Sequence, residues 1–90
     1  KNIAVQKGKV SMIVQEKILL RDVPNNTNVR LVKIDAGRML KARLAAMGLL
    51  PGCQFKVLNN GHPGPFLIDL KGSRIVLGRG MAGKIFVKPI

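Results

Sequence analysis

The chain has 90 residues, of which 47% are hydrophobic and 22% charged, with one cysteine and a formal net charge of +12. A domain of this length buries only roughly 60 to 65% of the surface that its unfolded chain exposes, which leaves no room for a deep active-site cleft. A single cysteine excludes an intramolecular disulfide, and with it a disulfide-stapled secreted scaffold. No apolar run approaches the roughly 20 residues that span a bilayer, so we expect a soluble, cytoplasmic protein.

The charge balance favours acidic partners. Sixteen Lys and Arg residues stand against four acidic ones, and nucleic acid, an anionic membrane surface or an acidic protein face would all suit such a field. The basic residues are scattered along the chain and never form a run of five. This distribution favours a diffusely basic domain over a nucleic-acid-binding tail.

The first predicted elements follow an N-terminal extension at residues 1–17, where short apolar pieces alternate with lysines. If Met12 is the natural start, residues 1–11 are a stretch added for expression; otherwise they belong to a longer natural arm. Residues 18–90 form the predicted domain. Within it, the Asn-rich cluster at 25–28 is typical of a turn, and the β-branched residues of 29–34 predict a strand.

A short helix is predicted over residues 38–47. Its apolar residues stand at i, i+4 and i+7, namely Leu40, Leu44 and Met47. Gly48 then supplies the left-handed residue that ends a helix of this kind.

The second half of the chain predicts short strands separated by turns. Strands are expected at 53–58, 66–70, 74–77 and 85–87, with an irregular loop at 59–65 and a Gly-rich corner at 78–83 that holds at most one helical turn. The fold class is therefore mainly β, a small barrel of about five strands with one short α-helix inserted after the first strand.

The sequence offers no constellation for catalysis or for metal binding. Four acids, one histidine and one cysteine are thinly spread, and His62 and Cys53 have no second His or Cys near them. The Gly-rich corner lacks the spacing of the Rossmann and Walker phosphate-binding loops. We therefore expect no catalytic residues, no metal site within one chain and no cofactor.

Residues 43–52, Arg-Leu-Ala-Ala-Met-Gly-Leu-Leu-Pro-Gly, closely resemble the signature of the FeoA family. The likeness continues in Pro-Gly-Pro-Phe at 63–66, Lys-Gly-Ser-Arg at 71–74, Leu-Gly-Arg-Gly-Met-Ala at 77–82 and Lys-Ile-Phe-Val at 84–87. It covers about residues 18–87.

This resemblance implies an SH3-like β-barrel that is not an enzyme and that serves bacterial ferrous iron uptake. The implied partner is the FeoB-type ferrous iron permease, through its cytoplasmic GTP-binding domain, so that the chain would be peripheral to the membrane only through that partner. Similar domains occur fused behind iron-dependent repressors, but this chain has no winged-helix segment, which disfavours that context. The oligomeric state, including a homo-oligomer, stays open.

The predicted partner-binding surface lies around the end of the helix. Its residues are Arg43, Met47, Leu49 and Leu50, with Arg38 and Lys41 at the rim. A Met and Leu patch bordered by cations has the composition of a protein interface. We expect Leu49 to point outward, because adjacent residues seldom face the same way, whereas Leu44 and Met47 also fit the core.

The alternative function is a nucleic-acid-binding SH3-like barrel, which the net charge of +12 favours because phosphate contacts dominate such affinity. The chain has only three phenylalanines and no Trp or Tyr. Because base stacking needs aromatic side chains, we expect no nucleic-acid partner.

Overall fold

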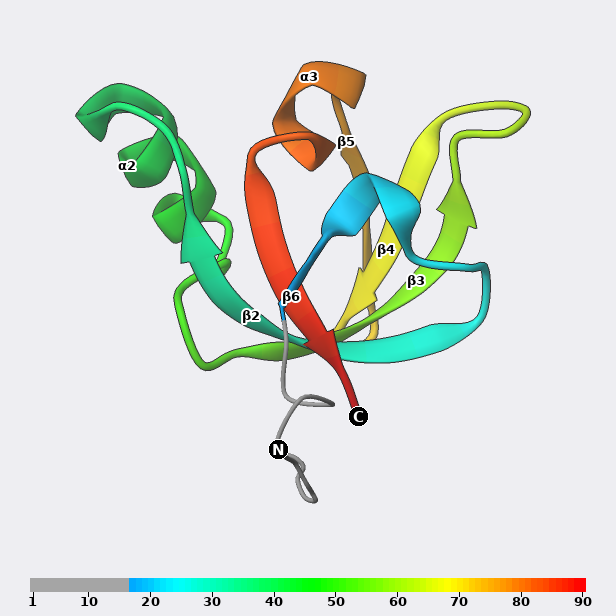
Figure 1. Cartoon of the computed structure of the whole chain (residues 1–90). Coiled ribbons are helices and arrows are strands. Elements are labelled where there is room, and N and C mark those ends of the chain that lie inside the picture. Colours follow the sequence, from blue (N-terminus) through cyan, green and yellow to red (C-terminus); the bar gives the residue numbers. More distant parts are fainter. Residues whose placement is uncertain (1–16) are drawn as a thin grey trace, which may run out of the picture.

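The chain folds into one antiparallel sheet of six strands in the order β1-β6-β2-β3-β4-β5 (Figure 1). The structure, a computed structural model, describes residues 17–90. The elements in chain order are β1 (Ile18–Leu19), the 3-10 helix η2 (Leu20–Asp22), β2 (Thr27–Ile34), α2 (Arg38–Ala46), β3 (Gln54–Asn60), β4 (Phe66–Leu70), β5 (Ser73–Leu77), α3 (Arg79–Ala82) and β6 (Ile85–Pro89).

The sheet curls around one core as an SH3-like barrel, and α2 lies outside it, on the opposite side from the β3–β4 loop (Figure 1). The barrel is open, because within residues 17–90 the two edge strands, β1 and β5, do not pair with each other. The mainly β fold class is thus confirmed. The five predicted strands correspond to β2 through β6, and β1 is an additional strand, so the main helix follows the second strand.

A β-bulge in β2 decides which of its side chains face outward. Leu31 pairs with Val87, but Lys33 pairs with Phe86, so the register shifts by one residue between them. Strict alternation from buried Leu31 would turn Lys33 inward. The shift instead buries Ile34 and exposes Lys33. Bulges commonly re-aim side chains in this way.

The core is aliphatic, with two of the three phenylalanines added to it. Its members come from every strand except β1, from α2, η2 and α3, and from two connecting segments, which contribute Val23 and Leu49. They are Leu20, Val23, Val29, Leu31, Ile34, Leu44, Leu49, Phe55, Val57, Phe66, Ile68, Leu70, Leu77, Ala82, Ile85 and Val87. The extension predicted at residues 1–17 falls, apart from Lys17, outside the described residues.

Candidate functional site

The C-terminus of α2 is closed by a Schellman motif, which positions everything that follows. The amide of Gly48 donates to the carbonyl of Ala45 at 2.9 Å, and the amide of Leu49 donates to the carbonyl of Leu44 at 2.9 Å. These bonds satisfy carbonyls that the helix end would leave unpaired. Gly48 has φ of +94°, as predicted, since the motif requires a left-handed residue at this point.

The same motif shows that the predicted orientation of Leu49 is wrong. Leu49 has no exposed surface, whereas Leu50 is 52% exposed. In a Schellman motif the residue after the glycine folds back toward the last helical turn, where it packs on the residue whose carbonyl accepts its amide. That residue is Leu44, also fully buried. The adjacent leucines do face opposite ways, but Leu50 is the outward one.

Replacing Gly48 by alanine is expected to lower the free energy of unfolding by about 1 to 2 kcal/mol, measured by urea denaturation. The strain has two sources: the positive φ, and a new Cβ that would lie 3.2 Å from Cδ2 of Leu70. Gly37→Ala is the matched control. Gly37 has φ of −71° and nothing within 4 Å of an added Cβ, so its replacement should be nearly neutral. Equal effects at both glycines would contradict the motif.

The turn after the helix is fixed to strand β2. Cys53 donates its amide to the carbonyl of Leu50 at 3.0 Å, and Gly52 has φ of +95°. These features define a type II turn with Pro51 in its second position. Two further hydrogen bonds join the turn to Leu31. The amide of Gly52 donates to the carbonyl of Leu31 at 2.7 Å, and the amide of Leu31 donates to the carbonyl of Cys53 at 2.8 Å. Leu50 is therefore held at the surface by a fixed backbone.

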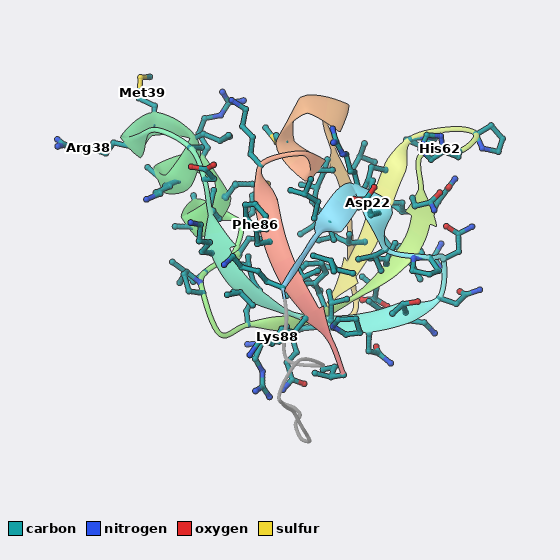
Figure 2. All side chains as sticks on the ribbon, in the orientation of Figure 1. Asp22, Arg38, Met39, His62, Phe86 and Lys88 are labelled. Atoms are coloured by element: carbon teal, nitrogen blue, oxygen red, sulfur yellow. The ribbon has the colours of Figure 1, made fainter. Side chains whose placement is uncertain are left out.

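A groove of about 600 Å³ lies between α2, the end of β2 and this turn. Its apolar lining consists of Ile34, Ala36, Ala42, Ala45, Leu49, Leu50 and Pro51. Its charged lining consists of Lys33, Asp35, Arg38 and Lys41. Figure 2 shows Arg38 extending from the tip of α2. The groove therefore has an apolar floor with three basic side chains and one acidic side chain around it.

The cations at the groove form no ion pair with the described part of the chain, residues 17–90. Among the side chains that the structure describes, which are those of residues 17–90 without Arg79, the one ion pair is Arg21 with Asp22, at 4.0 Å. Lys33, Arg38 and Lys41 are all exposed. An apolar floor with unpaired cations at its edge suits a segment that carries both aliphatic and acidic side chains.

The predicted surface residues lie on two different faces of α2. Arg38, Lys41, Ala42 and Ala45 line the groove. Arg43 and Met47 do not, because helical spacing turns them to the other side of the helix. Met47 is 38% exposed, so it is not a core residue, whereas Leu44 is. Of the four central residues predicted for the surface, only Leu50 is both exposed and at the groove, together with Arg38 and Lys41 of the predicted rim.

Sequence reasoning missed the small and acidic lining residues Ala36, Ala42, Ala45 and Asp35. The available signal for a second helix face was a helical spacing of i, i+3, i+4 and i+7, which is occupied by Arg38, Lys41, Ala42 and Ala45. This spacing did not predict an apolar face because alanine is small and occurs on both buried and exposed helix faces. Ala36 and Asp35 gave no signal, since they join the groove only through the packing of the β2–α2 connection.

Cys53 and His62 are not brought into a metal-binding group. Cys53 is half-buried beside the turn, and His62 is exposed on the β3–β4 loop (Figure 2). Among the described residues, no group of three or more His, Cys, Asp or Glu side chains could hold a metal ion. Nor does any helix in that part of the chain reach the length and hydropathy needed to cross a membrane.

The fold is that of small SH3-like domains that occur alone and within larger proteins. A solved structure described as the iron uptake regulatory protein FeoA superposes with a TM-score of 0.76 at 29% identity, covering 83% of this chain and 100% of that one. A manganese-dependent transcriptional repressor shares the fold with a TM-score of 0.75 at 19% identity, covering 93% of this chain but 46% of the repressor.

Sequence comparison identifies the family. A family model described as FeoA domain matches residues 18–89. A relative from Methanocaldococcus jannaschii, assigned as Fe(2+) transport protein A, is 48% identical over 56 residues, which cover 62% of this chain and 67% of the relative. The chain belongs to the FeoA family, which is associated with ferrous iron transport.

Proposed function

We propose that this chain is a cytoplasmic, non-enzymatic accessory protein of ferrous iron uptake that binds the cytoplasmic GTP-binding domain of a FeoB-type permease. Membership of the FeoA family supports a role in iron transport. The FeoB-type partner is the one that the family resemblance implies. Binding to a protein is supported by the cation-rimmed groove described above.

The groove next to Leu50 is the observation that carries this proposal. Leu50 is 52% exposed on a backbone held by three hydrogen bonds, so it is an apolar anchor that is ordered before any partner arrives. Preorganised apolar anchors lose little conformational entropy on binding. Lys41 and Arg38 at the rim would add attraction to acidic side chains of the partner.

Leu50→Glu is expected to weaken binding to the isolated GTP-binding domain of the permease by about 30-fold, the effect of losing an interface hot spot of roughly 2 kcal/mol. Binding is measured by isothermal calorimetry, with pull-down as a second readout. Because Leu50 is exposed, its replacement should leave the melting temperature nearly unchanged.

Met39→Glu is the matched control. Met39 is 82% exposed on α2, the helix next to the groove, and it does not line the groove (Figure 2). Its replacement by glutamate adds the same charge and should leave the affinity unchanged. If the wild-type protein does not bind the permease domain, the proposed partner is wrong. If both variants bind like the wild type, the groove is not the interface.

A further inference from the structure

The outer surface of the barrel carries a second group of basic residues, of which all but Lys33 lie outside the groove. Strand register places Arg30 directly opposite Lys88, Lys33 opposite Phe86, and Asn28 opposite Lys56. Because Val29, Leu31, Val57 and Val87 point into the core, these alternating neighbours point outward. The outer basic face is defined as Lys17, Arg30, Lys33, Lys56 and Lys88.

The bulge in β2 is what brings Lys33 to this face. With a regular strand, Lys33 would point into the core. The register shift sets it against Phe86 instead. Its Nζ lies 5.6 Å from the centroid of the Phe86 ring, and the Nζ of Lys17 lies 5.7 Å from the same ring. Figure 2 shows Phe86 and Lys88 along β6.

Within the described residues, the cations of the outer basic face repel one another and have no ion-pair partner. Like charges directly opposite each other on neighbouring strands, as in Arg30 and Lys88, lower the stability of a sheet. No cation of this face takes part in an ion pair with any residue from 17 to 90. Asp69 lies opposite Lys56, but one of its carboxylate oxygens accepts the amide of Gly72 at 2.8 Å. An external anionic surface would relieve this repulsion.

The aromatic side chains argue against nucleic acid as that surface. Stacking of bases needs exposed rings, but Phe55 and Phe66 are buried in the core. Phe86 has lysines at its ring already. The cations are spread over β6, β2, β3 and the residue before β1, so they match a broad plane of charge. Lipid head groups present such a plane and require no stacking.

We propose that the outer basic face docks this domain on an anionic lipid bilayer. Lys33 belongs both to this face and to the rim of the groove, so the two surfaces are adjacent. A domain lying on the membrane through its sheet would then hold the groove close to the bilayer, within reach of a membrane protein's cytoplasmic segment. This proposal does not depend on the identity of that protein.

The first test is sedimentation of the full chain with vesicles of phosphatidylcholine alone and with vesicles in which about a third of the lipid is phosphatidylglycerol. The protein should bind the anionic vesicles and not the neutral ones. Binding should weaken as salt rises from about 0.01 to 0.3 M, because the Debye length shortens from about 30 Å to below 8 Å. Absence of binding to anionic vesicles at low salt overturns the proposal.

Matched charge variants then separate this face from the net charge of the chain. The double variant Arg30→Gln, Lys88→Gln should lower the partition coefficient by about 25-fold, since each cation near an anionic leaflet strengthens binding by about fivefold. The variant is expected to fold, because it removes two opposed like charges. The control Arg21→Gln, Arg43→Gln removes the same net charge from other faces and should change partitioning by less than about threefold.

Three possible results of these measurements support or overturn docking on a lipid bilayer. A selective loss in the Arg30, Lys88 variant supports the bilayer. An equal loss in both double variants overturns the proposal, because net charge alone would explain binding. Tighter binding to single-stranded RNA or duplex DNA than to anionic vesicles, lost in the same variant, assigns the face to nucleic acid and also overturns it.

Discussion

Leu49→Ala is expected to lower the free energy of unfolding by about 2 to 5 kcal/mol, measured by urea denaturation followed by circular dichroism. The Leu49 side chain has no exposed surface and lies between the core and the floor of the groove. The hydrogen bond from its amide to Leu44 fixes the backbone, so the surroundings cannot collapse to fill the cavity. The denaturation midpoint should fall while the slope stays constant.

Leu50→Ala is the natural control for this prediction, because it removes the same atoms from the next residue. Leu50 is 52% exposed, so its truncation should cost less than about 1 kcal/mol. A charge at position 49 should be still more damaging, since a buried carboxylate has no partner there. Similar losses for the two alanine variants would show that the Schellman motif does not orient this segment as described.

Elements with a complete local signal could be predicted from the sequence. Strand β4 has the predicted bounds, 66–70, because three apolar residues alternate between clear turn signals on both sides. Helix α2 begins at the predicted residue, Arg38. Its end was also predictable, since only glycine readily adopts the conformation found at Gly48.

Elements that depend on distant contacts could not be predicted. Strand β1 has two residues, too few for any periodicity, and exists through its pairing with β6. Asn59 and Asn60 were predicted in a loop, because asparagine is depleted in strands. They belong to β3, where the amide of Asn60 donates to Oδ1 of Asn25 at 2.8 Å and its side chain donates to the carbonyl of Val23 at 3.3 Å.

The candidate site could be predicted only in part, because its position also depends on contacts between distant residues. The sequence indicated an apolar surface with cations near the end of the helix, and Leu50, Arg38 and Lys41 do lie at the groove. It did not indicate which face of the helix was involved, because the β2–α2 connection decides that through packing. Arg43 and Met47 remain exposed on the far face, where their part in partner binding is still a prediction.

Phe66→Ala is expected to lower the free energy of unfolding by about 3 to 5 kcal/mol. Phe66 is the largest fully buried side chain and is 2% exposed. It opens β4, where it pairs with Asn60 on one side and Leu77 on the other, so its ring fills space between three strands. For a domain of this size, each 1 kcal/mol lowers the melting temperature by about 4 to 8 °C, so a fall of at least about 12 °C should appear by calorimetry.

Phe86→Ala is the control, because it removes a phenylalanine ring from the outer surface and not from the core. Phe86 is half-buried on the outer surface, where it contacts Lys17 and Lys33 through cation–π interactions. Its truncation should cost about 1 to 2 kcal/mol, because exposed interactions of this kind contribute about 0.5 to 1 kcal/mol each. That cost should shrink at about 1 M salt, since screening weakens exposed electrostatic contacts, whereas the cost at Phe66 should not. If the two variants lose equal stability with the same salt dependence, Phe66 does not occupy the core position described.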